Sequence, residues 1–63
     1  MNNIRKLRRD RNMSQSELAK KAGISRGYLV MLENGRQENV TVKVLVAVAE
    51  ALGTNVAALL QNA

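Results

Sequence analysis

Hydrophobic residues recur at helical spacing over most of the chain, and their pattern predicts helices separated by short polar stretches. The first three predicted helices span about residues 3–12, 14–22 and 25–34, and the sequence contains no proline to interrupt them. Their inward positions are Ile4 and Leu7, then Leu18, Ala19 and Ala22, then Leu29 and Leu32. We therefore expect an all-α protein with a small core.

The C-terminal half is ambiguous by pattern alone, because the run VTVKVLVAVAEAL (40–52) is rich in valine, which favours strands. Its second part, AVAEAL, propagates a helix well, and the neighbouring elements are helical. We expect a fourth helix here, capped by Thr41 and ended by Gly53. A short fifth helix is expected to begin at Asn55 and to include Leu59.

Local signals mark the ends of the second and third helices. Residues 14–17, SQSE, match the capping box, in which a serine and a glutamate satisfy free backbone amides at the start of a helix. Gly23 suits the left-handed position after a helix, and Ser25 suits the cap of the next one. Since about three residues join these helices, they must cross at a steep angle, which is the geometry of a helix-turn-helix.

The outer face of the third helix lacks the usual mixture of glutamate and lysine. It carries Arg26, Gly27, Val30, Met31 and Asn34. Arginine can pair with guanine in the major groove, and valine or methionine can contact a thymine methyl group. Glycine inside a helix costs about 0.5–1 kcal/mol relative to alanine, so close approach of DNA would explain it. The alternative is an ordinary surface with two isolated apolar residues and a tolerated glycine.

The net charge of +5 is unevenly distributed. Residues 1–36 hold nine Lys/Arg against three acidic residues, whereas residues 37–63 hold one against two. A basic half predicts a surface that faces a polyanion, although such an excess can also serve solubility. The residues expected to reach phosphates are Gln15 and Ser16, at a helix N-terminus that favours anions, and Arg36, Gln37, Asn39 and Lys43.

The stretch SQSELAKKAGISRGYLVMLENG (14–35) resembles the helix-turn-helix of the Cro/repressor-type family, also called the XRE family. The resemblance extends from Ile4 to Leu60 and includes IRKLR before this stretch and EALG after it. It implies a compact five-helix, all-α, repressor-like domain over residues 1–63. It also implies binding of double-stranded DNA, usually as a dimer on a pseudo-palindrome.

Several residues match functional positions of that family. Gln15 resembles the glutamine that contacts phosphate and steadies the first residues of the third helix. Ser25, Arg26, Gly27 and Met31 occupy base-facing positions, and Tyr28 either reaches a phosphate or pads the edge of the core. Arg8 and Glu33 occupy the positions of an ion pair between the first and third helices, unless they are unrelated surface charges. Two features depart from the family pattern. Gly27 and Met31 replace the long polar residues often found at base-facing positions, and the loop after Gly35 is longer than the commonest form in the family and lacks its usual proline.

The composition argues against several other classes of protein. The chain has no cysteine and no histidine, so disulfides are excluded and zinc sites are not expected. Its five carboxylates form no plausible catalytic cluster, and we expect neither an enzyme nor a cofactor or small-molecule ligand. No apolar stretch approaches the roughly 20 residues of a membrane span. We expect a cytoplasmic, nucleoid-associated protein.

The C-terminal half has more aliphatic surface than one small core needs. Val40, Val42, Val44, Val46, Val48, Val56 and Leu60 cannot all point inward. Some of them are expected to form a homodimer interface, unless the chain is the DNA-binding part of a longer protein. The sequence thus predicts a sequence-specific transcriptional regulator that acts as a repressor. The alternative is an antitoxin-type or other protein-interaction module whose DNA binding is autoregulatory.

Overall fold

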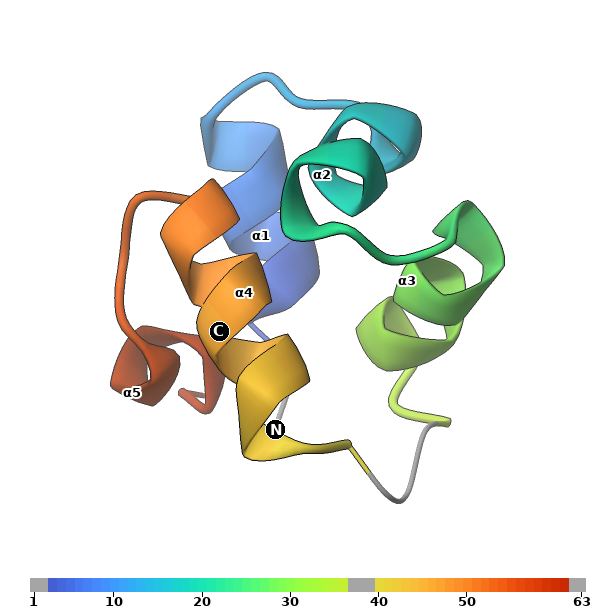
Figure 1. Cartoon of the computed structure of the whole chain (residues 1–63). Helices are drawn as coiled ribbons and strands as arrows, with labels where there is room; N and C mark the ends of the chain where they lie inside the picture. Colours follow the sequence, from blue (N-terminus) through green and yellow to red (C-terminus); the bar gives the residue numbers. More distant parts are fainter. Residues whose placement is uncertain (1–2, 37–39, 62–63) are drawn as a thin grey trace.

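The computed structural model describes residues 3–36 and 40–61 and is shown in Figure 1. Within these ranges every regular element is an α-helix. The helices are α1 (Ile4–Asp10), α2 (Gln15–Ala22), α3 (Arg26–Glu33), α4 (Val42–Ala51) and α5 (Val56–Leu59). The predicted all-α, five-helix architecture is therefore confirmed, and the valine-rich run is helical.

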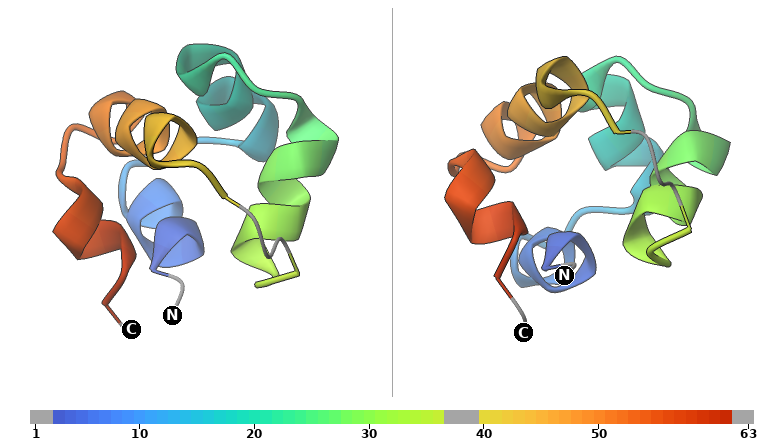
Figure 2. Two further views of the ribbon diagram at one scale, coloured as in Figure 1. Left: turned by 60° about the horizontal axis from the view of Figure 1, so that its bottom comes forward. Right: turned by 90° about the horizontal axis from the view of Figure 1, so that it is seen from below.

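The core lies where α2 and α4 meet, and the other helices close around it. α2 packs against both α3 and α4, α4 also packs against α5, and α1 packs against α3. The core consists of Ile4, Leu18, Ala19, Leu29, Leu32, Val48, Ala49, Leu52 and Leu59. Both views of Figure 2 place α3 and α5 on opposite sides of the molecule. The outer side of α3 therefore faces away from the C-terminal helix.

The side-chain caps expected from the sequence are present. Ser14 accepts a hydrogen bond from the backbone of Glu17, whose carboxylate accepts one from the backbone of Ser14, so the capping box is complete. Ser25, Thr41 and Asn55 each accept a hydrogen bond from the backbone N–H three residues further on. Each cap satisfies an amide that has no partner inside its helix.

The first helix is shorter than the sequence predicted. The expectation was about residues 3–12, but α1 spans Ile4–Asp10, and Asn12 adopts a left-handed conformation with φ of 54°. Asparagine tolerates this conformation better than most residues with a side chain. The reversal brings the backbone N–H of Met13 onto the carbonyl oxygen of Arg8, at 3.1 Å, and directs the chain into α2.

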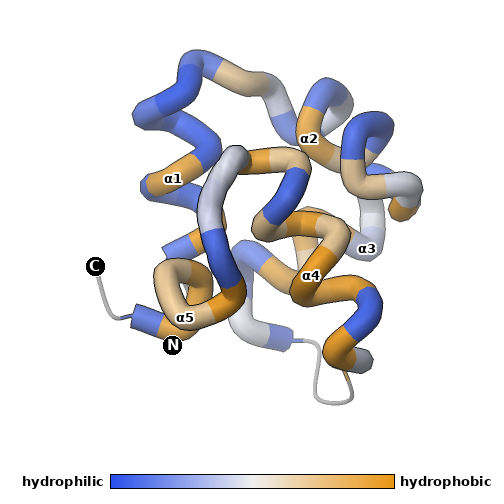
Figure 3. The backbone as a smooth tube through the Cα atoms, turned by 60° about the vertical axis from the view of Figure 1, so that its left-hand side comes forward, coloured by the Kyte–Doolittle hydropathy of each residue, from blue (hydrophilic) through white to orange (hydrophobic). Residues whose placement is uncertain are grey.

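The C-terminal half does expose aliphatic side chains that the core does not bury, as the sequence predicted. Figure 3 contrasts the mostly hydrophobic α4 with the largely hydrophilic α1. Val48 is buried, and Val40, Val44 and Val56 pack partly buried against the core. Val42, Val46 and Leu60 are instead 72%, 39% and 47% exposed. The core thus uses only part of this aliphatic surface.

The beginning and the end of the described chain are fastened together. The backbone N–H of Asn3, just before α1, donates to the carbonyl oxygen of Leu59 at 3.1 Å. The side-chain Nδ2 of Asn3 donates to the carbonyl oxygen of Ala58 at 3.0 Å. These bonds attach the start of α1 directly to α5.

Candidate nucleic-acid interface

The turn between α2 and α3 determines how α3 is presented. Gly23 ends α2 with φ of 73°, and the N–H of Ile24 returns to the carbonyl oxygen of Ala19 at 3.0 Å. Ile24 packs partly buried against the core, and Ser25 caps α3 immediately afterwards. The chain therefore changes direction within three residues, as the sequence predicted for a helix-turn-helix.

The predicted base-facing residues are all accessible. Ser25, Arg26, Gly27 and Met31 are exposed, as is Asn34 just after the helix, while Val30 is half-buried. On the opposite side of α3, Leu29 and Leu32 are buried in the core. A Cβ atom added at Gly27 would meet nothing within 4 Å, so the fold itself does not require glycine at this position.

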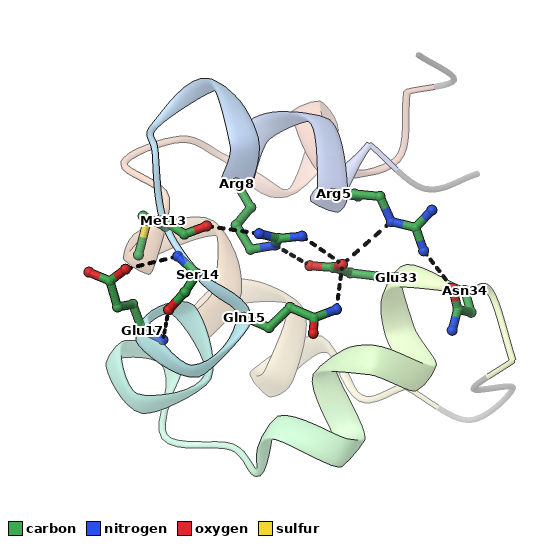
Figure 4. A network of polar contacts seen from close by, with 8 residues as sticks. All are labelled: Arg5, Arg8, Met13, Ser14, Gln15, Glu17, Glu33 and Asn34. Atoms are coloured by element: carbon green, nitrogen blue, oxygen red, sulfur yellow. Dashed lines mark hydrogen bonds and ion pairs between the residues drawn. The ribbon is translucent and has the colours of Figure 1, made fainter.

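A buried carboxylate holds the last turn of α3 against α1, and Figure 4 shows its partners. The Glu33 side chain is fully buried. Arg8 donates from Nε to Oε2 of Glu33 at 2.6 Å and from an Nη atom to Oε1 at 3.3 Å. The predicted ion pair between Arg8 and Glu33 is thus present and is bidentate. The alternative of two unrelated surface charges is wrong.

Further contacts extend this network beyond the predicted pair. Arg8 also donates to the carbonyl oxygen of Met13 at 2.8 Å, which ties down the loop before α2. Arg5 lies 3.5 Å from the carboxylate of Glu33 and donates to Oδ1 of Asn34. The sequence analysis gave no role to the contact of Arg5 with Asn34. In the sequence, only the spacing of the basic residues along α1 could have indicated this contact.

The electrostatics of Glu33 follow from its surroundings. Burial raises the pKa of this carboxyl group, but hydrogen bonds from Arg8 and Gln15 and the charge of Arg8 lower it by more, with help from Arg5. The net result is a pKa below the ordinary value for glutamate. Glu33 is therefore ionised at neutral pH, and two arginines from α1 hold it.

Gln15, the first residue of α2, also joins the network around Glu33. Its side-chain Nε2 donates to Oε1 of Glu33 at 3.2 Å. This bond holds the last residue of α3, a contact that the family resemblance had not suggested. The contacts of Gln15 with phosphate and with the first residues of α3 stay predictions. Glu33 is thus contacted from α1 by Arg8 and from the first residue of α2 by Gln15.

The remaining predicted phosphate contacts lie around α3. Ser16, Arg36 and Lys43 are exposed. Tyr28 packs partly buried against the core, which agrees with the padding role proposed for it, while its contact with phosphate stays a prediction. Gln37 and Asn39 lie outside the described residues.

Residues 3–36 and 40–61 contain neither a metal site nor a membrane-spanning helix. No cluster of three or more acidic, cysteine or histidine side chains is arranged to hold a metal ion there. None of the described helices is long and apolar enough to cross a membrane. The network around Glu33 and the outer face of α3 are the features that remain to be explained.

Comparisons with known proteins show which family has this fold. The helix-turn-helix family model matches residues 4–59. The immunity repressor protein of Bacillus phage phi105 is 43% identical over 56 residues, 89% of this chain and 38% of that protein. The control protein C.SmaI of Serratia marcescens is 40% identical over 58 residues, 92% of this chain and 68% of that protein. The chain therefore spans well under half of the first relative and about two thirds of the second.

A solved structure shares the fold at similar identity. It is the crystal structure of SinR, the master regulator for biofilm formation, in complex with DNA. The TM-score is 0.84 at 36% sequence identity, and the match covers 92% of each chain. By their names, the first relative is a repressor and the second a control protein, and SinR is a regulator whose structure contains DNA.

Proposed function

Because this chain belongs to the XRE-type helix-turn-helix family, we propose that it binds specific sequences of double-stranded DNA and represses transcription from them. α3 is the recognition helix in this proposal. Ser25, Arg26, Gly27 and Met31 face the bases of the major groove. The phosphate contacts are those predicted from the sequence, and they supply most of the affinity.

The observation that carries the proposal is the contrast between the two sides of α3. Its inner side is fixed by Leu29, Leu32 and the buried Glu33, so the helix has one orientation. On its outer side, the side chains of Arg26 and Met31 have no polar partner among the described contacts, and Arg26 can pair with guanine. A rigid helix with an accessible outer side is what direct readout of base edges requires.

We further propose that the protein binds as a homodimer through its C-terminal half. Val42, Val46 and Leu60 are exposed there, and their burial between two copies would add to a small core. Two-fold symmetry would place two recognition helices about 34 Å apart, one turn of DNA. In this proposal the whole chain acts as one domain in the cytoplasm. Occupancy of the operator then depends on the concentration of the protein itself.

The first test is selection from a randomised pool of duplex DNA at about 150 mM salt. We expect enrichment of a two-fold symmetric site whose half-sites lie about one turn apart. Enrichment of a single half-site would retain the DNA-binding function and reject the dimer. Binding without enrichment that disappears as salt rises would reject sequence-specific recognition and turn attention to a protein partner on the C-terminal half.

The second test assigns Arg26. Arg26→Ala should weaken binding by about 1–3 kcal/mol and relax preference at one base position per half-site, because a base contact is lost. Lys20→Ala is the matched control, since it removes the same charge from the exposed side of α2. A uniform loss across all DNA sequences for Arg26→Ala would make Arg26 a phosphate contact.

A further inference from the structure

One exposed hydrophobic residue sits apart from the others. Among the described residues, the large exposed hydrophobic side chains are Met31, Val42, Val46 and Leu60. The last three belong to the C-terminal half, where the proposed dimer interface would cover them. Met31 is 43% exposed and lies on α3, which Figure 2 places on the side of the molecule opposite α5.

Met31 has apolar neighbours on the same side of its helix. Gly27 precedes it by four residues and Val30 follows Gly27 by three, so all three lie close together along the helix surface. The absent side chain at Gly27 leaves open space, since a Cβ atom there would meet nothing within 4 Å. We call Gly27, Val30 and Met31 the apolar patch of α3.

The chemistry of the patch restricts what it can recognise. Its side chains offer no hydrogen-bond donor and no strong acceptor, so they cannot match the polar edge of a base. The apolar group that the major groove presents is the C5-methyl group of thymine. Cytosine methylated at C5 carries the same group at the same place, although its neighbouring polar atom differs.

We propose that Gly27, Val30 and Met31 recognise the C5-methyl group of a pyrimidine, next to the base pair that Arg26 contacts. This inference rests on the proposed function and adds the chemical group that is read. Gly27 gives the methyl group room to approach the helix backbone, and Met31 and Val30 cover it. Burying one methyl group should change affinity by about four-fold per half-site.

The test uses the operator found by selection and replaces each thymine in turn with deoxyuridine, which removes only the C5-methyl group. Dissociation constants would be measured by fluorescence anisotropy for duplexes changed in both half-sites. We expect one position at which uracil weakens binding by about four-fold per half-site, while other positions change little. Met31→Ala should abolish this preference for thymine over uracil, whereas the control Lys20→Ala should keep it.

A second arm distinguishes the two sources of the methyl group. At the sensitive position, a cytosine duplex would be compared with its 5-methylcytosine counterpart. Tighter binding of the methylated duplex supports recognition of the methyl group from either base, and equal binding restricts it to thymine. Equal affinity for thymine and uracil at every position of an enriched operator, or a preference unchanged in Met31→Ala, would overturn the inference but leave the proposed function intact. Failure to enrich any operator would instead reject the proposed function.

Discussion

The two helices of the helix-turn-helix are similar in design but are stabilised differently. α2 and α3 each have eight residues and a serine cap. α2 adds a capping box, Glu17 in its first turn, and Lys20 and Lys21 in its last turn, all of which favour the helix and complement its dipole. α3 has no acidic residue in its first turn, no basic residue in its last turn, and Gly27 in its second position.

The comparison shows that α3 depends on its neighbours for stability. Both helices bury side chains in the core, but α2 also has local stabilising signals, whereas α3 relies on its buried leucines and on the contacts of Glu33 with α1 and α2. This division of roles leaves the outer side of α3 free to carry residues that do little for helix formation. Arg26, Gly27 and Met31 therefore do not have to stabilise the helix and are free for the proposed contacts with DNA.

The strongest test of this dependence removes the carboxylate. Glu33→Ala leaves Arg8 buried without its partner and should lower the free energy of unfolding by about 3–5 kcal/mol. Urea denaturation followed by circular dichroism measures the loss. The control is Lys6→Ala, which breaks the exposed pair with Asp10 and should cost at most about 1 kcal/mol. Equal effects of the two changes would contradict the proposed dependence.

The same carboxylate predicts how stability depends on pH. The pKa of Glu33 is lowered in the folded state, so its contribution is complete above about pH 5 and is lost as pH falls through the folded pKa. Thermal unfolding between about pH 6 and 3 should show this loss. Glu33→Gln should be less stable at neutral pH but should vary less over the same range. Parallel curves for the two proteins would show that other carboxylates dominate.

Removing the serine caps should have a smaller effect on stability than removing Glu33. The order is also reversed, because the loss should be larger for α2 than for α3. Ser14→Ala should cost about 1 kcal/mol, since it removes the cap and its reciprocal contact with Glu17. Ser25→Ala removes only the hydrogen bond to the N–H of Tyr28 and should cost less. Urea midpoints of the two variants compare them directly. A greater loss for Ser25→Ala than for Ser14→Ala would contradict the view that local signals contribute more to α2 than to α3.

The smallest expected effect on stability is a gain. Gly27→Ala should stabilise the protein by about 0.5–1 kcal/mol, because the helix favours alanine and the added Cβ atom meets nothing within 4 Å. The same change should weaken binding to the operator, where the methyl group needs that space. Calorimetry and a binding titration on one sample measure both. A variant that is more stable and binds equally well would remove Gly27 from the interface.

Most of the fold could be predicted from the sequence, because its signals are local. The four caps and the left-handed Gly23 depend on residues within one turn of each other. The bond from Gln15 to Glu33 and the attachment of Arg5 to Asn34 depend instead on how helices cross. Spacing in the sequence does not fix those crossings or the reach of a long side chain. The pairing of Arg8 with Glu33 was predicted only because the family resemblance supplied it.

The bonds between Asn3 and the α5 carbonyls have an architectural consequence. Since they join the two ends of the described chain, any segment fused at either terminus would leave the molecule near the contact of α1 with α5. α3 lies on the side opposite α5 (Figure 2). We therefore expect that a sensor or an oligomerisation module attached at either end would not obstruct α3, the proposed recognition helix. This arrangement agrees with the relatives, in which the matched region makes up 38% of one protein and 68% of the other.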